Sequence, residues 1–190
     1  MSPLHILKLP FSSLDGWVSL RQSHPSVLET FFFLTMPFSL IPPAMLIYAG
    51  AHHGDIYPVT ASAARWQEVA IVFFVMELLT VPLVAWLIKQ VASAHQIKVG
   101  FRDTFLLAAV TAIPMWLSAF GLAIPSLWPS IAVLCLGVVL GGCLLFRGCD
   151  SFLRTGEELE AQAIAAEVFA GGALMWVALC AAVVLQLMNG

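Results

Sequence analysis

Five stretches of the sequence are almost wholly apolar over about 20 residues each, which is the length that a helix needs to cross a membrane core roughly 30 Å thick. They run near Leu28–Gly50, Val69–Ile88, Thr104–Ala123, Ser126–Phe146 and Ala166–Met188. No internal repeat or low-complexity linker separates them. The sequence therefore predicts an all-α integral membrane protein, with five transmembrane helices that form one compact domain over residues 27–190.

The composition excludes a soluble protein. Apolar residues make up 61% of the 190 residues and charged residues 10%, whereas soluble domains have about 45–50% and about 25%. A soluble domain of this size cannot hide so many apolar side chains. The mean hydropathy is +0.95. A formal net charge of −3 offers no polycationic surface, so nucleic acid is excluded as a partner.

The basic residues predict the orientation. If the N-terminus is cytoplasmic, seven basic residues lie on the cytoplasmic side and only Arg65 lies outside. The seven are Lys8, Arg21, Lys89, Lys98, Arg102, Arg147 and Arg154. Because Lys and Arg near the span ends favour the cytoplasmic side, we expect a cytoplasmic N-terminus. An odd number of spans then places the C-terminus outside.

Residues 1–26 are predicted to form a cytoplasmic N-terminal arm. Leu14, Trp17 and Val18 recur at helical spacing, and Ser12 or Ser13 is suited to cap a short helix. Such an amphipathic helix would lie on the cytoplasmic surface of the membrane. A poorly ordered arm anchored by Trp17 alone is the alternative.

Glu77 is the most unusual residue of the predicted spans, because it lies near the middle of the second one. A charge at that depth costs at least about 2.5–3.5 kcal/mol, so such groups usually face the protein interior or a wet cavity. Together with Thr80 it forms a candidate intramembrane polar site for a proton or a cation. The interpretation we favour is structural: a neutral carboxyl group that is hydrogen-bonded within the bundle, since no other acid lies at a span centre.

Prolines interrupt three of the spans. Pro42 and Pro43 lie in the first span, Pro82 in the second and Pro114 in the third. Each removes a backbone donor, so these four positions are candidate helix breaks. Such breaks line substrate cavities in many transporters, but they also occur in helices that only pack against neighbours. We favour packing, and we expect any cavity to lie at Glu77, Thr80 and the Pro42–Pro43 break.

Small residues mark two spans for close helix packing. Gly137 and Gly141 form a GxxxG motif in the fourth span, which allows a second backbone to approach closely. One side of the fifth span carries a row of alanines, at positions 166, 170, 178 and 182. The two faces would pack together, or one would serve a homodimer. The sequence thus leaves open which partners the protein has besides the lipid bilayer: another membrane protein or a second copy of itself.

Nothing in the sequence favours an enzyme, a metal site or a bound cofactor. His52, His53 and Asp55 cluster after the first span, but adjacent histidines point in different directions and a metal site needs three or four convergent ligands. The four cysteines form no CxxC pair, and we interpret them as free thiols. No HExxH, GxSxG, Walker loop or Gly-rich dinucleotide turn is present.

A family resemblance emerges in the second half of the chain. Its pattern opens at Ala112–Ser118 and continues through Pro125, Trp128, Gly137, Leu144–Gly148, Ser151–Leu153 and Glu157–Glu158. The chain thereby resembles the YIP (YIPF) membrane-protein family, and within it the bacterial YohC-like branch. The element formed by Trp17, Leu20 and His24–Pro25 is similar to a short segment before the first span of that branch. The resemblance implies five spans in a bacterial inner membrane, a cytoplasmic N-terminus and no catalytic residues.

We therefore expect a non-enzymatic organising or adaptor role in the membrane, with protein or lipid partners. The absence of catalytic motifs, the small residues suited to helix packing and the charged loop after the fourth span motivate this expectation. A small transporter or channel that uses Glu77 is the alternative. An intramembrane enzyme would need a second polar catalytic group at the depth of Glu77.

Overall fold

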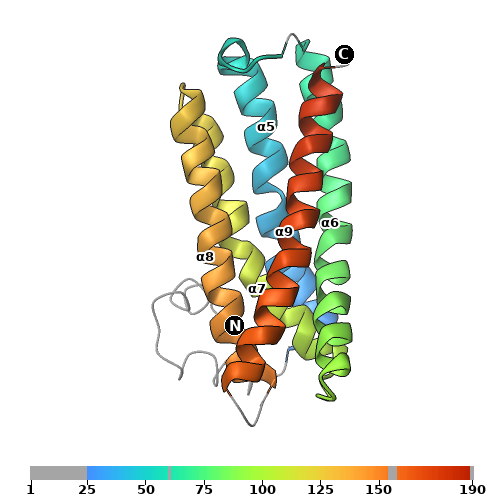
Figure 1. The fold of residues 1–190 in the computed structure, drawn as a ribbon. Helices are drawn as coiled ribbons and strands as arrows, with labels where there is room; N and C mark the ends of the chain where they lie inside the picture. Colours follow the sequence, from blue (N-terminus) through green and yellow to red (C-terminus); the bar gives the residue numbers. More distant parts are fainter. Residues whose placement is uncertain (1–24, 60, 154–157, 189–190) are drawn as a thin grey trace.

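The structure is a computed structural model that describes residues 25–59, 61–153 and 158–188. It is 89% helical, and those ranges contain no strand. In chain order the elements are α3 (Val27–Thr30), the π-helical turn η2 (Phe31–Thr35), α4 (Met36–Ser39), α5 (Ile41–His52), the 3₁₀ turn η3 (Gly54–Ile56), α6 (Ala63–Ala94), α7 (Phe101–Ser118), the 3₁₀ turn η4 (Ala119–Ala123), α8 (Leu127–Leu153) and α9 (Glu158–Met188). Figure 1 shows them as one bundle.

Five helical segments are long and apolar enough to cross a membrane, which confirms the predicted all-α fold with five spans. They are Val27–His52, Ala63–Ala94, Phe101–Ala123, Leu127–Leu153 and Leu159–Met188. The helices extend beyond most of the predicted apolar runs because polar residues continue and cap them. At α6, for example, the Ser62 Oγ accepts a hydrogen bond from the Arg65 N–H at 3.3 Å. The predicted arm and its amphipathic helix lie outside the described residues, apart from Pro25 and Ser26.

The first span consists of three short α-helices joined by a π-helical turn. It begins at a capping box, in which the Ser26 Oγ accepts from the Glu29 N–H and the Glu29 Oε2 accepts from the Ser26 N–H. α4 ends at Ser39, and Pro42 and Pro43 occupy the first turn of α5. A first turn tolerates proline because its N–H groups have no partner within the helix. The Pro42–Pro43 pair therefore lies at a helix boundary inside the span.

Pro82 and Pro114 lie within helices that continue past them. α6 runs without interruption through Pro82 to Ala94. α7 continues past Pro114 to Ser118, where the chain tightens into η4. Neither proline ends its helix, because packing against neighbouring helices offsets the lost backbone hydrogen bond.

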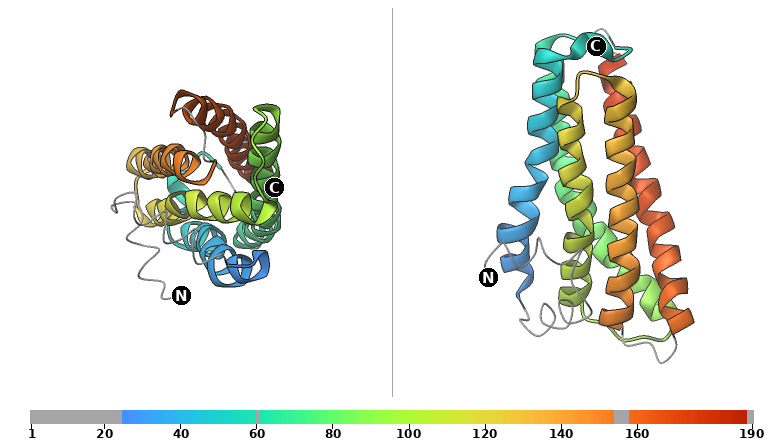
Figure 2. Two further views of the ribbon diagram at one scale, coloured as in Figure 1. Left: turned by 90° about the horizontal axis from the view of Figure 1, so that it is seen from below. Right: turned by 90° about the vertical axis from the view of Figure 1, so that its left-hand side faces the viewer.

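α7 is the central helix of the bundle. In the most apolar stretch of the third span, 67% is buried inside the bundle, whereas the corresponding value for the fifth span is 11%. α7 packs against α6, α8 and the first span, whereas α9 packs on α6 and α8 and has few contacts with α7. Seen from below, α7 lies between the first span and α9 (Figure 2). The bundle thus has a dense half around α7 and a looser half between α7 and α9.

The two ends of the described chain lie on opposite faces of the bundle. α3 begins at the lower face of Figure 1 and α9 ends at the upper face. α6 and α8 end at the lower face, where α7 and α9 begin, and α5 and α7 lead to the upper face, where α6 and α8 begin. We call the lower face the inner end and the upper face the outer end, after the orientation that the basic residues predict.

Candidate intramembrane binding site

A cavity of about 480 Å³ occupies the looser half of the bundle. All five spans contribute to its lining, with α6 to α9 supplying most of it. The lining is apolar or aromatic except for Tyr57, Glu77, Thr80, Thr111 and Cys180. A concave, mainly apolar site of roughly 300–1,000 Å³ with a few polar groups is typical of small-molecule binding. The cavity therefore has the size and chemistry of a site for an apolar ligand.

The cavity opens between the outer halves of α8 and α9. Figure 1 shows these two helices diverging toward the outer end, with α5 visible between them. Ile131 on α8 and Val184 on α9 both line the cavity, yet they are 40% and 48% exposed. Their exposed parts lie on the surface of a membrane-spanning bundle. The opening therefore leads sideways into lipid.

Toward the inner end, the same two helices come into contact. Gly142 on α8 faces Phe169 on α9, and a Cβ atom built on Gly142 would lie 2.7 Å from the ring carbon Cε2 of Phe169. Leu145 and Val168 line the cavity near this contact, and both are buried. The cavity is therefore closed at its inner end and open at its outer half.

Glu77 lies on the cavity wall near the middle of α6. Glu77 is 8% exposed, and its Oε2 atom is buried without a hydrogen-bond partner among the described residues. The side chains of Trp116 on α7 and Cys180 on α9 lie near this carboxyl group. The interhelical hydrogen bond favoured from the sequence stays a prediction.

Two threonine hydroxyl groups of the cavity lining have hydrogen-bond partners on their own helices. Thr80 Oγ1 donates to the Met76 carbonyl oxygen at 2.8 Å. Thr111 Oγ1 donates to the Ala108 carbonyl oxygen at 3.0 Å. Each threonine therefore uses its single hydroxyl donor within its own helix. Thr80 lines the cavity beside Glu77, as the sequence suggested, but it does not satisfy the free carboxyl oxygen.

Tyr57 places a second unpartnered polar atom at the outer part of the cavity. It comes from the connection between α5 and α6, and its buried hydroxyl oxygen forms no hydrogen bond within the described residues. Burial raises the pKa of the Tyr57 hydroxyl, and the Ser130 side chain nearby opposes this shift. The sequence analysis did not single out Tyr57, because a tyrosine in a short connection is unremarkable without the fold around it.

The predicted helix-packing glycines lie against α7 and not against α9. A Cβ on Gly137 would lie 2.5 Å from the Ser118 side chain and 2.9 Å from the Pro114 carbonyl oxygen. A Cβ on Gly141 would lie 2.9 Å from the Thr111 carbonyl oxygen. The GxxxG motif therefore allows close approach of α7 and α8 within one chain, whereas Ala166, Ala170 and Ala178 on α9 are exposed.

Gly172 differs from the other glycines of the helical bundle. It lines the cavity, and a Cβ built on it would meet no atom within 4 Å. A Cβ on its neighbour Gly171 would instead lie 2.7 Å from Leu87. The Gly171–Gly172 pair was the available sequence signal for this position, but nothing in the pair distinguishes the packed glycine from the open one.

Of the predicted helix breaks, only Pro42 lines the cavity. Pro43 and Pro114 are buried in the bundle, and Pro82 is partly buried on α6. The Pro42–Pro43 boundary therefore reaches the cavity through one of its two residues. Pro82 and Pro114, the candidate breaks in α6 and α7, lie outside the lining.

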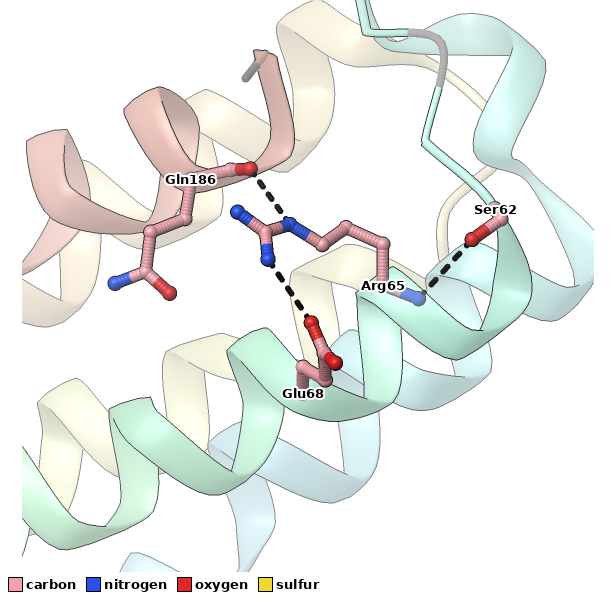
Figure 3. Close-up of polar contacts among 4 residues, drawn as sticks. All are labelled: Ser62, Arg65, Glu68 and Gln186. Atoms are coloured by element: carbon pink, nitrogen blue, oxygen red, sulfur yellow. Dashed lines mark hydrogen bonds and ion pairs between the residues drawn. The ribbon is translucent and has the colours of Figure 1, made fainter. Parts of the chain in front are cut away.

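Arg65 connects the outer ends of α6 and α9. Its Nε donates to the Gln186 carbonyl oxygen at 3.0 Å, and its Nη1 donates to Glu68 Oε2 at 2.9 Å (Figure 3). The last carbonyl groups of a helix lack partners within the helix, and a basic side chain often satisfies one of them. Arg65 thus caps α9 from a neighbouring helix and holds the outer edge of the cavity between α6 and α9.

The histidines after the first span form an aromatic cluster. His52 stacks on Tyr48 with ring centroids 4.3 Å apart, and its Nδ1 lies 3.0 Å from the Tyr48 carbonyl oxygen. Within the described ranges, no group of three or more His, Cys, Asp or Glu side chains is arranged to hold a metal ion.

The fold and the cavity define the class of this protein: a multi-pass helical membrane protein with an apolar cavity between its spans. The chain belongs to the Yip1 domain family, which matches residues 7–182. This match confirms the resemblance to the YIP family that the sequence patterns carried. No curated protein and no solved structure is significantly similar to the chain.

Proposed function

We propose that this protein is a non-enzymatic organising protein of the bacterial inner membrane, which acts by holding a lipid chain in its intramembrane cavity. The observation that carries this proposal is the apolar cavity, whose lining residues on α8 and α9 include the exposed Ile131 and Val184. Lipid is the medium that surrounds this opening, and apolar surface binds apolar chains without polar contacts.

The proposal is tested by filling the cavity from one position. Gly172→Leu adds a side chain where a Cβ meets no atom, so it should occupy the cavity without disturbing the helix contacts. We expect native mass spectrometry of the protein released from lipid nanodiscs to show bound lipid for the natural chain. The Gly172→Leu variant should lose most of that lipid.

The matched control is Ala170→Leu, which enlarges a residue of the same helix on its exposed side, away from the cavity. It should retain lipid at the level of the natural chain. Equal lipid retention by both leucine variants would contradict the proposal, because the bound lipid would then lie on the outer surface of the bundle.

A proton-linked transporter is the second candidate, and one observation favours it: Glu77 lines the cavity, and one of its carboxyl oxygens is buried without a hydrogen-bond partner among the described residues. Ionisable groups at this depth often mark proton or ion pathways. This candidate predicts that Glu77→Gln abolishes a proton-linked flux in proteoliposomes, because an amide cannot carry the proton. A flux that the substitution leaves unchanged excludes it.

A further inference from the structure

The cavity reaches the outer ends of the helices that surround it. Leu127, the first residue of α8, lines the cavity, and so does Leu187, next to the last residue of α9. Trp66 lines it three residues after the start of α6. The connection from α5 to α6 contributes Tyr57. The cavity therefore extends to the outer end of the bundle.

Toward the inner end, the cavity stops well before the helices do. Its innermost lining residues on α6, α7, α8 and α9 lie 7 to 10 residues from the inner ends of these helices, which corresponds to about 10–15 Å. They are Val84, Ala108, Leu145 and Val168. We call these four residues the floor of the cavity. A layer of protein about 10–15 Å thick therefore separates the floor from the inner end of the bundle.

The layer beneath the floor is closely packed. Just inward of the floor, each of the four helices has a residue that is 0% exposed: Ile88, Leu107, Cys149 and Ile164. All four belong to the same hydrophobic core cluster. Protein interiors packed in this way contain few voids larger than a water molecule. A lipid chain that enters the cavity from the outer end therefore stops at the floor.

This shape gives a bound lipid one direction. The exposed lining residues Ile131 and Val184 each lie four residues from the outer end of their helix. A lipid of the outer leaflet can insert its chain there while its polar head group stays at the membrane surface, where water solvates it. A lipid of the inner leaflet meets the packed layer instead. The cavity therefore favours a chain that enters from the outer leaflet.

The depth of the cavity is similar on two helices. Leu127 and Leu145 are 18 residues apart on α8, and Leu187 and Val168 are 19 residues apart on α9. Both separations correspond to about 27–29 Å, whereas one leaflet covers about half of a core roughly 30 Å thick. A short chain would leave empty apolar space above the floor, which is unfavourable. A chain longer than the cavity would have to displace packed atoms. The depth thus favours a limited range of chain lengths.

Phe169 has the largest side chain at the level of the floor. It lines the cavity next to Val168. Its ring lies between α9 and Gly142 of α8, because a Cβ atom on Gly142 would be 2.7 Å from the ring carbon Cε2. The four floor residues are aliphatic and smaller. Removal of the Phe169 ring would therefore add more depth to the cavity than truncation of any floor residue.

We propose that the cavity takes up a lipid chain tail first from the outer leaflet, and that Phe169 determines the longest chain that fits. This inference rests on the proposed function and adds to it the direction of entry and a selectivity for chain length. Phe169 has the role of a specificity-determining residue, which contacts the terminal methyl group of the bound chain.

The first experiment tests the direction of entry. The full chain, in nanodiscs of phosphatidylethanolamine and phosphatidylglycerol, is labelled with a phosphatidylglycerol probe that carries a photoactivatable diazirine either at the end of one acyl chain or in the head group. Mass spectrometry of peptides identifies the labelled residues. The tail probe should label Phe169 and the floor, and the head-group probe should label the outer end of the cavity around Tyr57.

A filled cavity provides the control for labelling by lipid on the outer surface. Gly172→Leu should abolish labelling of the floor but retain labelling of Leu174, which is 71% exposed on the same helix. Tail labelling at the floor combined with head-group labelling at the inner ends of α8 and α9 would overturn the direction of entry.

The second experiment tests the selectivity for chain length with a homologous series of tail probes. In the natural chain, labelling of the floor should rise with chain length to a maximum and fall at least roughly fivefold for longer chains, because these must displace packed atoms. Phe169→Ala should move the maximum to longer chains. Phe169→Leu, which keeps an apolar side chain opposite Gly142, should move it in the same direction by less.

Phe73→Ala is the matched control. Phe73 also lines the cavity, but it lies on α6 and packs against the hydrophobic cluster that contains Trp66 and Leu187 near the outer end. Its truncation should therefore leave the maximum unchanged. Labelling by the shorter probes shows that each variant still folds. An unchanged maximum in both Phe169 variants, or an equal shift in Phe73→Ala, would overturn the role of Phe169.

The same experiments distinguish failure of this inference from failure of the proposed function. If tail probes of all lengths label the floor of the natural chain equally, and Gly172→Leu abolishes this labelling, the cavity holds a chain without selecting its length, and only the inference fails. If Gly172→Leu leaves the labelling unchanged, the labelled lipid lies outside the cavity, and the proposed function fails as well.

Discussion

Gly142 on α8 lies directly against the aromatic ring of Phe169 on α9, so closely that a Cβ atom at position 142 would be 2.7 Å from the ring. The two helices meet at this contact and diverge toward the outer end (Figure 1). The contact therefore sets where the cavity closes, and the separation of α8 and α9 above it sets how wide the cavity opens.

Substitution of Gly142 should separate α8 from α9 at the closed end. Gly142→Val should destabilise the folded bundle by about 1–3 kcal/mol, because extra atoms in a packed contact force neighbouring groups to shift. Thermal unfolding in detergent measures the effect. Gly172→Val, the same change at the open glycine of α9, should cost much less. Equal losses at the two positions would mean that Gly142 and Phe169 do not pack as described.

Substitution of Gly137 should also destabilise the bundle, because this glycine packs closely against α7. Even Gly137→Ala brings a Cβ to 2.9 Å from the Pro114 carbonyl oxygen, a backbone atom that cannot rotate away. We expect a lower unfolding temperature, with a cost of about 1–3 kcal/mol. Gly137 packs against α7 of the same chain, so size-exclusion chromatography with light scattering should give the same mass for the variant and the natural chain. A change of mass would assign Gly137 to an interface between chains.

Arg65 should stabilise the outer end of α9 through the Gln186 carbonyl oxygen. Arg65→Ala is expected to cost about 1 kcal/mol, since it leaves a helix-terminal carbonyl without its donor. Glu68→Gln should have a smaller effect, because the Glu68 side chain is 66% exposed and exposed ion pairs contribute little. Hydrogen exchange of the last turn of α9 measures the local effect, and faster exchange is expected only in the arginine variant.

Because of Tyr57, the stability of the folded chain should fall at alkaline pH. Burial raises the pKa of its hydroxyl above the ordinary value of 10.0, so the folded chain binds this proton more tightly than the unfolded chain. The resulting stability is fully present below about pH 10 and is lost as the pH rises through the folded-state pKa. Thermal unfolding at a series of pH values should show this loss in the natural chain and a weaker one in Tyr57→Phe. Identical profiles would show that Tyr57 titrates as if exposed.

The orientation of the chain is open to direct measurement. Reporter fusions should place a tag on the N-terminus in the cytoplasm and a tag on the C-terminus outside it, because five spans separate the ends and the basic residues favour the inner end. Fusions at residue 97, between α6 and α7, serve as an internal control and should report the cytoplasm. Both termini in one compartment would contradict the odd number of spans.

The spans were predictable from the sequence because a run of about 20 apolar residues has few alternatives to a membrane helix. Their arrangement was not. The last span is apolar on all sides, from Leu174 on its exposed face to Val168 in the core. A helix of this kind carries no amphipathic signal that says which face meets which neighbour. Its packing on α6 and α8, at a distance from α7, is therefore a result of the structure alone.

The candidate site was predictable only at its polar residues. Glu77 was conspicuous because a carboxyl group in a span is rare, and the structure places it in the lining beside Thr80 and Pro42. The remaining lining consists of the same residue types that face lipid elsewhere, such as Ile131 and Val184. The sequence gives no difference between an apolar side chain that faces an internal cavity and one that faces the bilayer.

The position of α9 also constrains when the cavity comes into being. α9 is the last of the five spans that the ribosome synthesises, and it supplies one whole wall. While the first four spans enter the membrane, the cavity around Glu77 therefore lacks one wall and cannot retain a ligand. Under the proposed function, binding of a lipid would therefore be a late event in the biogenesis of each molecule.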